Sequence, residues 1–493
     1  MSLINQEKNN IKHKSGTIDQ MLASEYFYII FRYLPTNKDL YSCILVNRYW
    51  ANCAVPILWE SPFKINDEYN LLPKVIQIYL TFIQTENSHN DPLFNRPLYD
   101  YPSFLKELPF YRFLNSVIAN NCTETQIVEL FKNFQMHLVK LRRFDLSHLH
   151  LNFNGLIAYR VLLDYSSIFN RLSYLNCTYN WEVNEAQKVQ KAQIFNELAK
   201  SCHNIRNLKA TVRCKEEGIA LANLISSQRC LKKFSLVNSN IFASFSVQSL
   251  QSQTRSLNSL TFKNMHHSNL GVNAIFRYTT FQLNEKAISS LSQCTNITEL
   301  KFKHCEGLIY FPINSIFRNL TSLEYTYGSY PIIGNAPPIE ILSSLIKMNG
   351  KTIENVTFDW QWHYNDRTDY IQLIKNIAEC TMNLKYLKAP IYTLEQLALI
   401  LHTKNQLKKL EIHIDYRIHP YCALFLFTNM PFNNLKNSII QLYFNGHGNL
   451  RPEVNQLKQV FEQIFYKNDQ ISNFVLYQQN WPNLSNDNKE KLI

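Results

Sequence analysis

A short apolar motif recurs along most of this chain: an apolar residue, two residues of any kind, a second apolar residue, one more residue and a third apolar residue. Its last two apolar positions alternate with polar ones, which is typical of a short half-buried strand. The copies follow one another at intervals of roughly 23 to 40 residues, a spacing typical of repeat proteins. They are Leu141/Phe144/Leu146, Leu172/Leu175/Cys177, Ile205/Leu208/Ala210, Leu231/Phe234/Leu236, Leu257/Leu260/Phe262, Ile297/Leu300/Phe302, Leu320/Leu323/Tyr325, Ile353/Val356/Phe358, Leu384/Leu387/Ala389, Leu407/Leu410/Ile412, Ile439/Leu442/Phe444 and Ile471/Phe474/Leu476.

Segments with helical spacing of apolar residues lie between these strand motifs. One of them begins with a capping box, Thr393-Leu394-Glu395-Gln396. Because strand, helix and strand alternate with right-handed crossovers, the strands should be parallel, with helices on the other side. We therefore predict a curved α/β leucine-rich-repeat solenoid over residues 136–480, with parallel strands inside and helices outside. The expected helices are 192–199, 217–225, 285–291, 339–348, 370–378, 394–401 and 454–465.

A different pattern precedes the repeats, because Leu22 to Phe63 reads as three short helices. In the first, the apolar residues at helical spacing are Phe27, Ile30, Phe31 and Leu34, and the following proline ends the helix. The apolar residues of the other two helices are Leu40, Ile44 and Leu45, and Trp50, Ala54 and Leu58. A segment of about 40 residues cannot enclose a core of its own. Part of its apolar surface should therefore pack on another protein or on the rest of the chain.

The order of residues in this segment resembles the F-box, in particular the fungal form that ends in Trp-Glu-x-Pro-Phe. The resemblance implies a docking module that binds the Skp adaptor of a cullin-RING ubiquitin ligase, while the remainder of the chain selects the target protein. The chain has Leu22-Ala23 where the family usually has Leu-Pro, and we expect the missing proline to weaken adaptor binding. The resemblance rests on Leu22, Glu25, Ile30, Phe31, Leu34, Asp39, Leu40, Leu45, Val46, Asn47, Arg48, Trp50, Leu58 and Trp59.

Several apolar residues of this segment are the expected adaptor contacts. Two interpretations are open for Trp50, which either packs among the helices or contacts the adaptor directly. Trp59 is expected to join the box to the repeats. The expected adaptor-binding residues are Leu22, Ala23, Ile30, Leu34, Leu40, Leu45, Val46 and Trp50.

The 493 residues are too many for one compact globule unless they form an elongated repeat array. We expect a disordered tail at 1–20, the F-box at 21–63, a helical region at 64–135, the solenoid at 136–480 and a polar tail at 481–493. Within the helical region, 64–82, 104–117 and 124–134 have helical spacing, and the proline-containing stretch 84–103 reads as a loop.

Composition limits the classes of partner and the cellular compartment but identifies no specific function. The formal net charge of +12 comes from 50 Lys and Arg against 38 Asp and Glu, spread along the chain. This favours a solvated surface and acidic protein partners over nucleic acid. The 11 cysteines lack close pairs, which indicates buried free thiols. No secretory signal and no apolar run of about 20 residues is present, so we expect a cytoplasmic or nuclear protein without a membrane partner.

No motif indicates catalysis. The chain has only 10 glycines and contains neither HExxH nor GxSxG. His148 and His150 share one side of an extended segment, but metal ligation would need further ligands, and a solvated or capping role is the alternative. His266 and His267 point different ways in any regular element. We expect no metal, no cofactor and no enzymatic activity.

The predicted target-binding surface is the strand face of the solenoid. Lys263, Lys301 and Lys303 would lie on neighbouring strands about 5 Å apart and form a positive strip for an acidic segment of the target. The alternative is a merely solvated strand face. The expected target contacts are Lys263, Glu299, Lys301, Lys303, Lys409 and Glu411, with His413 also pointing outward.

The function that follows is substrate recognition in an SCF-type (Skp-cullin-F-box) ubiquitin ligase. One alternative is a leucine-rich-repeat scaffold that is not coupled to a ubiquitin ligase. Another is a hydrolase hidden in the repeat region, which would need a deep pocket with converging polar groups.

Overall fold

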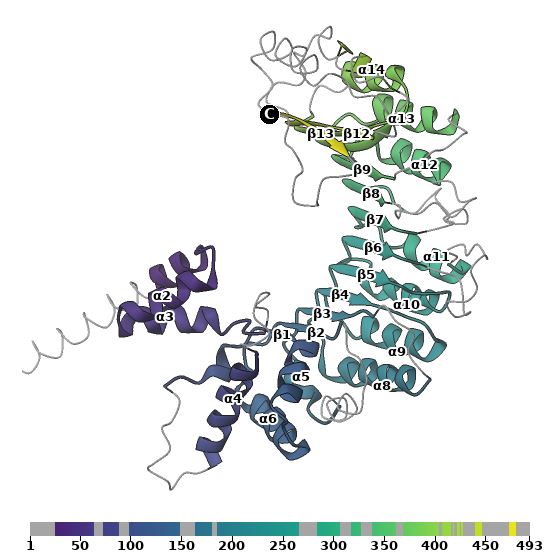
Figure 1. The fold of residues 1–493 in the computed structure, drawn as a ribbon. Coiled ribbons are helices and arrows are strands. Elements are labelled where there is room, and N and C mark those ends of the chain that lie inside the picture. The colour runs from purple at the N-terminus through teal and green to yellow at the C-terminus, as the bar shows by residue number, and fades with distance from the viewer. Residues whose placement is uncertain are drawn as a thin grey trace, which may run out of the picture. The chain divides into compact units, whose positions relative to one another are not determined.

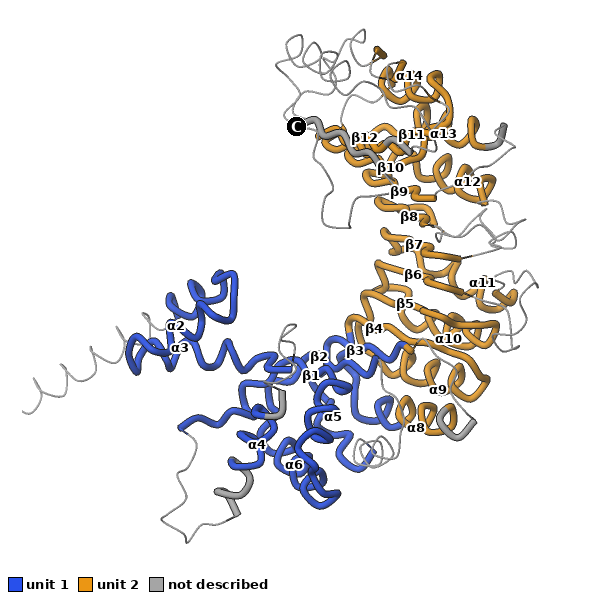
Figure 2. Tube along the Cα trace, viewed as in Figure 1, with its two compact units in different colours: residues 1–178, 197–205 blue, residues 179–196, 206–493 orange. Residues whose placement is uncertain are grey.

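The computed structural model describes most of the chain (Figure 1). It divides into two compact units (Figure 2), residues 1–178 with 197–205 as unit 1, and residues 179–196 with 206–493 as unit 2. The predicted tails lie outside the described residues. The residues that the structure describes are 25–63, 72–87, 98–147, 163–179, 185–265, 283–305, 317–326, 338–360, 368–403, 407–415, 418, 422–423, 425–426, 439–445 and 473–479.

Unit 1 begins with three short helices, as predicted. The Thr36 side chain and Asp39 form a reciprocal capping box at the start of the second helix. The Asn47 side chain accepts a hydrogen bond from the backbone N–H of Trp50 at the start of the third. Such caps satisfy N–H groups that have no partner within the first helical turn. The helices are residues 25–32, α2 (Asn37–Val46) and α3 (Arg48–Leu58).

The rest of unit 1 combines helices with three short strands. Strand β1 pairs in parallel with β2, and β2 with β3. Two predictions are wrong here: β1 lies inside the segment 104–117 that we expected to be helical, and α4 continues into the expected loop 84–103. The elements are α4 (Leu72–Asn87), η1 (Tyr101–Phe104), β1 (Glu107–Pro109), α5 (Phe110–Ala119), α6 (Glu124–His137), β2 (Arg143–Asp145), η2 (Ser166–Phe169) and β3 (Tyr174–Cys177).

Aromatic rings fill the core of this part of unit 1. The ring of Phe113, on α5, lies 5.7 Å from that of Phe131 and 5.8 Å from that of Phe134, both on α6. Phe110 adds a contact at 5.5 Å to Phe144 on β2. All five rings are buried, and large aromatic side chains contribute most to packing where they are fully removed from water. The two helices and β2 are thereby held in one packed unit.

Unit 2 is a parallel sheet with helices on one side (Figure 1). Each strand from β4 to β13 pairs in parallel with the next. The strands are β4 (Asn207–Ala210), β5 (Lys233–Val237), β6 (Ser259–Lys263), β7 (Glu299–Lys303), β8 (Ser322–Thr326), β9 (Asn355–Asp359), β10 (Tyr386–Ile391), β11 (Lys409–Ile414), β12 (Ile439–Asn445) and β13 (Asn473–Gln479). The helices are α8 (Glu185–Ser201), α9 (Lys215–Ser226), α10 (Ala243–Ser249), η3 (Leu250–Gln253), α11 (Glu285–Ser292), α12 (Ile339–Asn349), α13 (Thr368–Cys380) and α14 (Leu394–Thr403).

The apolar strand motif predicts the register of this sheet. Leu260 pairs with Leu300, and Phe262 with Phe302, and all four side chains are fully buried. Each predicted copy of the motif coincides with a strand from β2 to β13. The parallel sheet with its helices confirms the predicted α/β repeat fold, and its curvature stays a prediction.

Three details of unit 2 bear on single predictions. In β12, Ile440 rather than Leu442 pairs with Leu410, so the register of this strand is shifted by two residues from the expected one. Helix α10 was not predicted, because its sequence ASFSVQS has no helical stripe of apolar residues. The capping box at Thr393 is present, with Gln396 accepting from the backbone N–H of Thr393 at 3.2 Å. The expected helix 454–465 lies outside the described residues.

Successive repeats are joined by a forked hydrogen bond at the turn before most of the described strands. The carbonyl of Lys232 accepts from the N–H groups of Asn258 and Ser259 at 2.9 and 3.1 Å, and the carbonyl of Asn258 accepts from those of Thr298 and Glu299. Because each fork connects one turn to the next, residues of neighbouring turns lie in rows about 4.8 Å apart. Side-chain amides add further bonds to the preceding turn from Asn296, Asn319 and Asn383.

The cysteines are free thiols. This agrees with the prediction, and most of them are at least partly buried, although Cys230 and Cys422 are exposed. In the part of the chain that the structure describes, no helix has both the length and the apolar character that a membrane crossing requires.

Candidate protein-docking surfaces

The three amino-terminal helices enclose a small core, so the expectation that this segment has no core of its own is wrong. Phe31, Leu40, Cys43, Cys53 and Ala54 are buried between them, with other apolar side chains packed against this cluster. The Trp50 ring lies 5.2 Å from that of Phe31 and 5.3 Å from that of Phe27. Of the two interpretations of Trp50, packing among the helices is therefore the one that the structure supports.

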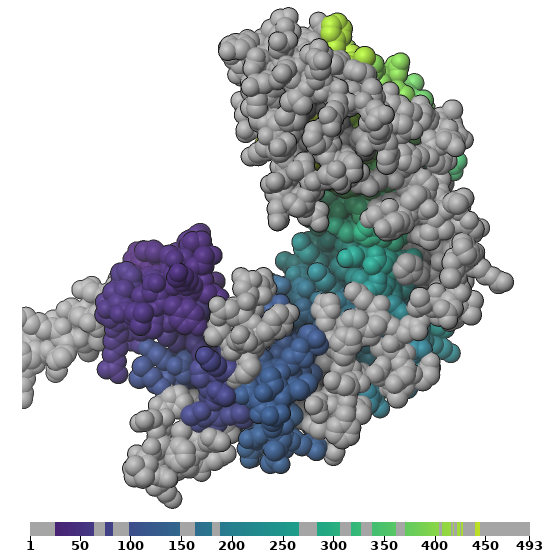
Figure 3. All heavy atoms as spheres, in the orientation of Figure 1, coloured from purple at the N-terminus to yellow at the C-terminus, as the bar shows by residue number. Residues whose placement is uncertain are grey.

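A second set of apolar side chains on the same helices points into solvent. Leu45 is 86% exposed and Tyr33 is 84% exposed, far more than such side chains usually are in a soluble domain. In the space-filling view, the atoms of residues 25–63 are drawn in purple (Figure 3). Several large apolar side chains left exposed on one small domain indicate a site of protein association. We call this set the F-box apolar face: Tyr26, Ile29, Ile30, Tyr33, Tyr41, Leu45 and Val46.

The expected adaptor-binding residues divide between this face and the core. Ile30, Leu45 and Val46 lie on the F-box apolar face. Leu34 is half-buried against the core. Leu40, at 6% exposure, belongs to the core because it is enclosed between the helices, and so does Trp50. Leu22 and Ala23 lie outside the described residues.

Four residues of the face were missed by the sequence analysis: Tyr26, Ile29, Tyr33 and Tyr41. A signal for them existed. Positions 26, 29, 30 and 33 repeat at helical spacing beside the core positions 27, 31 and 34, so the first helix carries two adjacent apolar stripes. The small core can bury only one of these two apolar stripes, so the other stays exposed.

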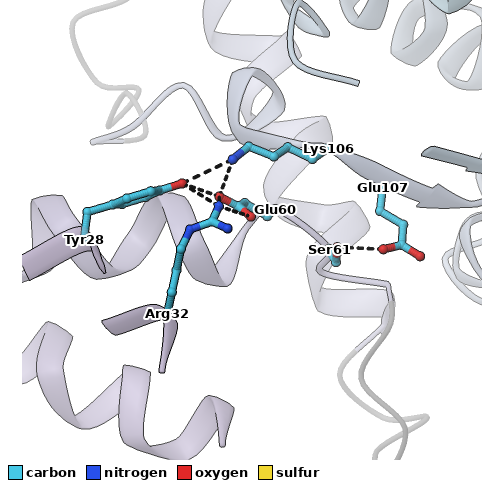
Figure 4. A network of polar contacts seen from close by, with 6 residues as sticks. All are labelled: Tyr28, Arg32, Glu60, Ser61, Lys106 and Glu107. Atoms are coloured by element: carbon cyan, nitrogen blue, oxygen red, sulfur yellow. Dashed lines mark hydrogen bonds and ion pairs between the residues drawn. The ribbon is translucent and has the colours of Figure 1, made fainter. Parts of the chain in front are cut away.

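The end of the box is fixed to the rest of unit 1 by the Glu60 carboxylate (Figure 4). Its Oε1 accepts hydrogen bonds from Tyr28 Oη at 2.5 Å, Arg32 Nη2 at 2.6 Å and Lys106 Nζ at 2.6 Å. Lys106 also donates to Tyr28 Oη at 3.2 Å. Tyr28 and Arg32 come from the first helix and Lys106 from the segment before β1. The carboxylate thus binds groups from both sides of the junction.

Charge and burial have opposing effects on the cations in this cluster. Burial lowers the pKa of Lys106, but hydrogen bonds to Glu60 and Tyr28 and the charge of Glu60 outweigh it and leave that pKa raised. The hydrogen bond to Tyr28 and the charge of Glu60 raise the pKa of Arg32. Both side chains therefore stay charged beside Glu60 at neutral pH, and the attraction persists.

The backbone of Glu60 also starts the series of forked bonds. Its carbonyl accepts from the N–H groups of Lys106 and Glu107 at 2.9 and 3.0 Å, as later carbonyls do before later strands. Trp59 is buried, with its ring 4.2 Å from that of Tyr101, and Phe63 is fully buried. The ring contacts of Trp59 thus belong to the helical region 64–135, and the expectation that it joins the box to the repeats is wrong.

The open face of the sheet in unit 2 holds the expected target contacts. Lys263 pairs in register with Lys303. Glu324 on β8, which the sequence analysis missed, lies 2.5 Å from Lys303 Nζ and 3.8 Å from Lys301 Nζ. Glu324 therefore neutralises part of the positive charge that we expected for the strip of three lysines. Glu299 lies on the same face, opposite Ser259 of β6.

The other two expected target contacts belong to an ion-pair chain across β9 to β11. Lys409 lies 2.5 Å from Glu411, and Lys388 lies 2.7 Å from Asp359 and 3.9 Å from Glu411. Glu411 and His413 are each only 8% exposed, so the expectation that both point into solvent is wrong. The ring of His413 stacks on that of Tyr443 at 4.6 Å. This part of the face is compact and nearly neutral.

The described residues contain no group of three or more His, Cys, Asp and Glu side chains arranged to hold a metal ion. His148, His150, His266 and His267 lie outside them.

Comparison with known proteins agrees with the family resemblance of the amino-terminal segment. Residues 25–65 match a family model described as F-box-like, so the chain carries an F-box-like domain. No curated protein matches the chain. Among solved structures, it is similar to one from the crystal structure of the Rad7 and Elc1 complex in yeast, with 12% identity, 81% of this chain and 80% of that chain covered and a TM-score of 0.36. We draw no functional conclusion from a structural similarity of this degree.

Proposed function

We propose that this protein is the substrate-recognition subunit of an SCF-type ubiquitin ligase, whose F-box-like domain docks a Skp-type adaptor and whose repeats bind a target protein. The observation that carries the proposal is the F-box apolar face. Seven large apolar or aromatic side chains on a domain of this family stay in water while the domain has a core of its own. Burying each of them against an adaptor would contribute about 1.5–3 kcal/mol.

The repeats supply the second half of the proposal. A parallel sheet with helices on one side leaves its other face to solvent and partners. The charged side chains on this face, Lys263, Glu299, Lys301 and Lys303, are of both signs, and Glu324 joins them across β6 to β8. We propose that a target protein contacts them through a surface of mixed charge. The adaptor would connect this receptor to a cullin-RING ligase in the cytoplasm or nucleus, with no chemistry performed by the chain itself.

Adaptor capture tests the docking step. We expect the double variant Leu45→Asp, Val46→Asp to lose the Skp-type adaptor and the cullin on purification from cells, because both charges would have to be desolvated at the interface. Both side chains point away from the core, so the circular dichroism spectrum should not change. The control is Leu98→Asp, which places the same charge on a side chain that is 66% exposed outside the box. Wild-type adaptor capture by the double variant would contradict the proposed docking surface.

The same purification decides between the proposal and a scaffold that is not coupled to a ligase. A scaffold would retain partners of the repeats but no Skp-type adaptor and no cullin. The target itself can be sought among proteins that accumulate, by mass spectrometry, when residues 22–63 are deleted. If no protein accumulates in cells that carry this deletion, a scaffold that is not coupled to a ligase explains the result better than the proposed receptor.

A further inference from the structure

Unit 2 carries a group of cations on the turns before β4, β5 and β6 and at the first residue of β5, on a different part of the sheet from the expected target contacts. All five members are exposed. Among the described residues, none of them has a carboxylate partner. We call this group the basic edge: Arg206, Arg229, Lys232, Lys233 and Arg255.

The forked bonds place these cations side by side. The carbonyl of Arg206 accepts from the N–H groups of Lys232 and Lys233 at 2.8 and 2.9 Å. The carbonyl of Lys232 then accepts from the N–H groups of Asn258 and Ser259, which follow Arg255. Gln253, at the end of η3, donates to the carbonyl of Gln228, next to Arg229. The three turns are therefore adjacent. At about 4.8 Å from one turn to the next, the row is roughly 10 Å wide.

The surrounding sequence does not compensate this charge. Between Glu217 and Glu285 the chain contains no aspartate or glutamate. Like charges on neighbouring strands repel one another and destabilise a sheet. The ion pairs of β7 to β11 show that the same fold elsewhere places carboxylates opposite its lysines. An uncompensated row of cations is instead suited to a partner that brings the negative charge.

We propose that the basic edge binds a short acidic stretch of a protein partner. An extended chain advances about 3.3 Å per residue, so about four residues carrying carboxylates would span the row. The proposal rests on the proposed function, in which the repeats receive a protein. A protein is favoured over nucleic acid because, in the described part of unit 2, no exposed aromatic ring lies on these turns to stack on a base.

The test uses the full chain and a fluorescent peptide with a short run of glutamates between Gly-Ser flanks. The triple variant Arg229→Glu, Lys232→Glu, Arg255→Glu should bind the peptide at least about tenfold more weakly than the wild type at low salt, as three exposed charge pairs are lost. The control variant Lys215→Glu, Lys286→Glu, Lys347→Glu reverses the same number of exposed cations on helices α9, α11 and α12. It should bind the peptide like the wild type.

Two results would overturn the proposal: equal peptide affinity in the two triple variants, or tighter binding of an oligonucleotide of similar charge than of the peptide in the wild type. Adaptor capture is measured on the same preparations. If peptide binding fails while the adaptor is retained, the basic edge is rejected and the docking function is not. If the wild type binds the peptide but captures no adaptor, the docking function is rejected and the basic edge is not.

Discussion

At the scale of single residues, Glu60 carries more of the architecture of unit 1 than its place in the sequence suggests. Its carboxylate is 18% exposed and receives three donors, while its carbonyl receives two backbone N–H groups. Hydrogen bonds between charged groups are stronger than those between neutral ones, although exposure of Arg32 and Lys106 weakens them here. One residue thus fixes both the first helix and the segment before β1.

Replacing Glu60 by Ala should therefore loosen the F-box-like domain from β1. We expect the free energy of opening of the amides of Lys106 and Glu107, measured by hydrogen exchange, to fall by about 1–2 kcal/mol. The control is Glu107→Ala, because the nearby Glu107 carboxylate has longer contacts, at 3.5 Å to both Ser61 and Arg143. Equal exchange in the two variants would show that the carboxylate of Glu60 adds nothing to the junction.

A second residue-scale prediction concerns acid sensitivity at His413. Burial lowers the pKa of this imidazole below its ordinary value of about 6.5, Asp359 and Glu411 act to raise it, and Lys388 acts to lower it. As the pH falls through about 6.5, the unfolded chain takes up the proton first. The stability that the neutral ring confers is then lost progressively toward its lower folded pKa.

We expect the thermal midpoint to fall between about pH 7.5 and about pH 5.5, and to fall less in His413→Phe, which keeps a ring against Tyr443 but cannot be protonated. His402→Phe, on the exposed end of α14, serves as the control. An identical pH dependence in wild type and His413→Phe would exclude His413 as the source.

At the scale of elements, the sequence predicted a helix or strand best where its pattern lies within a few consecutive residues. The strand motif depends on a few consecutive residues, and it predicted β2 to β13. The motif is also present at Leu105, Leu108 and Phe110, but Phe110 opens helix α5, and the helical spacing that follows concealed β1. Which face of a short helix is buried depends on its neighbours, so Leu40 could not be assigned to the core from sequence. Glu324 lies between Leu323 and Tyr325 of a predicted motif copy and pairs with Lys301, so the motif alone contained the signal for it.

The repeats should also behave as coupled elements. Phe302 is fully buried and its ring lies 5.7 Å from that of Phe262 on β6. Because each repeat buries its apolar side mainly against its neighbours, Phe302→Ala should cost about 3–5 kcal/mol and speed hydrogen exchange in β6 and β8 as well as in β7. Exchange in α2 and α3 should not change. Met348→Ala, at a partly exposed side chain on α12, is the control, and exchange confined to β7 would contradict the coupling.

At the scale of the whole molecule, two surfaces of different chemistry lie in two different units. The F-box apolar face belongs to unit 1 and the basic edge to unit 2. The sequence shows the net charge of +12 as a dispersed excess, because Arg206, Lys232 and Arg255 are separated by more than 20 residues. Only the stacking of the repeats brings them together. Charge clustering in a repeat protein is thus a property of the fold that runs of sequence do not reveal.

Because the two surfaces differ in chemistry, we expect salt to weaken peptide binding and to leave adaptor binding unchanged. An interface between apolar side chains gains no stability from long-range charge, whereas exposed cations attract an acidic peptide over a screening length that shrinks from about 10 Å at 0.1 M to about 3 Å at 1 M salt. Raising NaCl across this range should release the glutamate peptide and leave the Skp-type adaptor bound, as followed by anisotropy and by co-purification from one preparation. In the Arg229→Glu, Lys232→Glu, Arg255→Glu variant the weak residual peptide binding should lose its salt dependence. Parallel loss of adaptor and peptide as salt rises would mean that one charged surface serves both partners, and the division of roles between the two units would then be wrong.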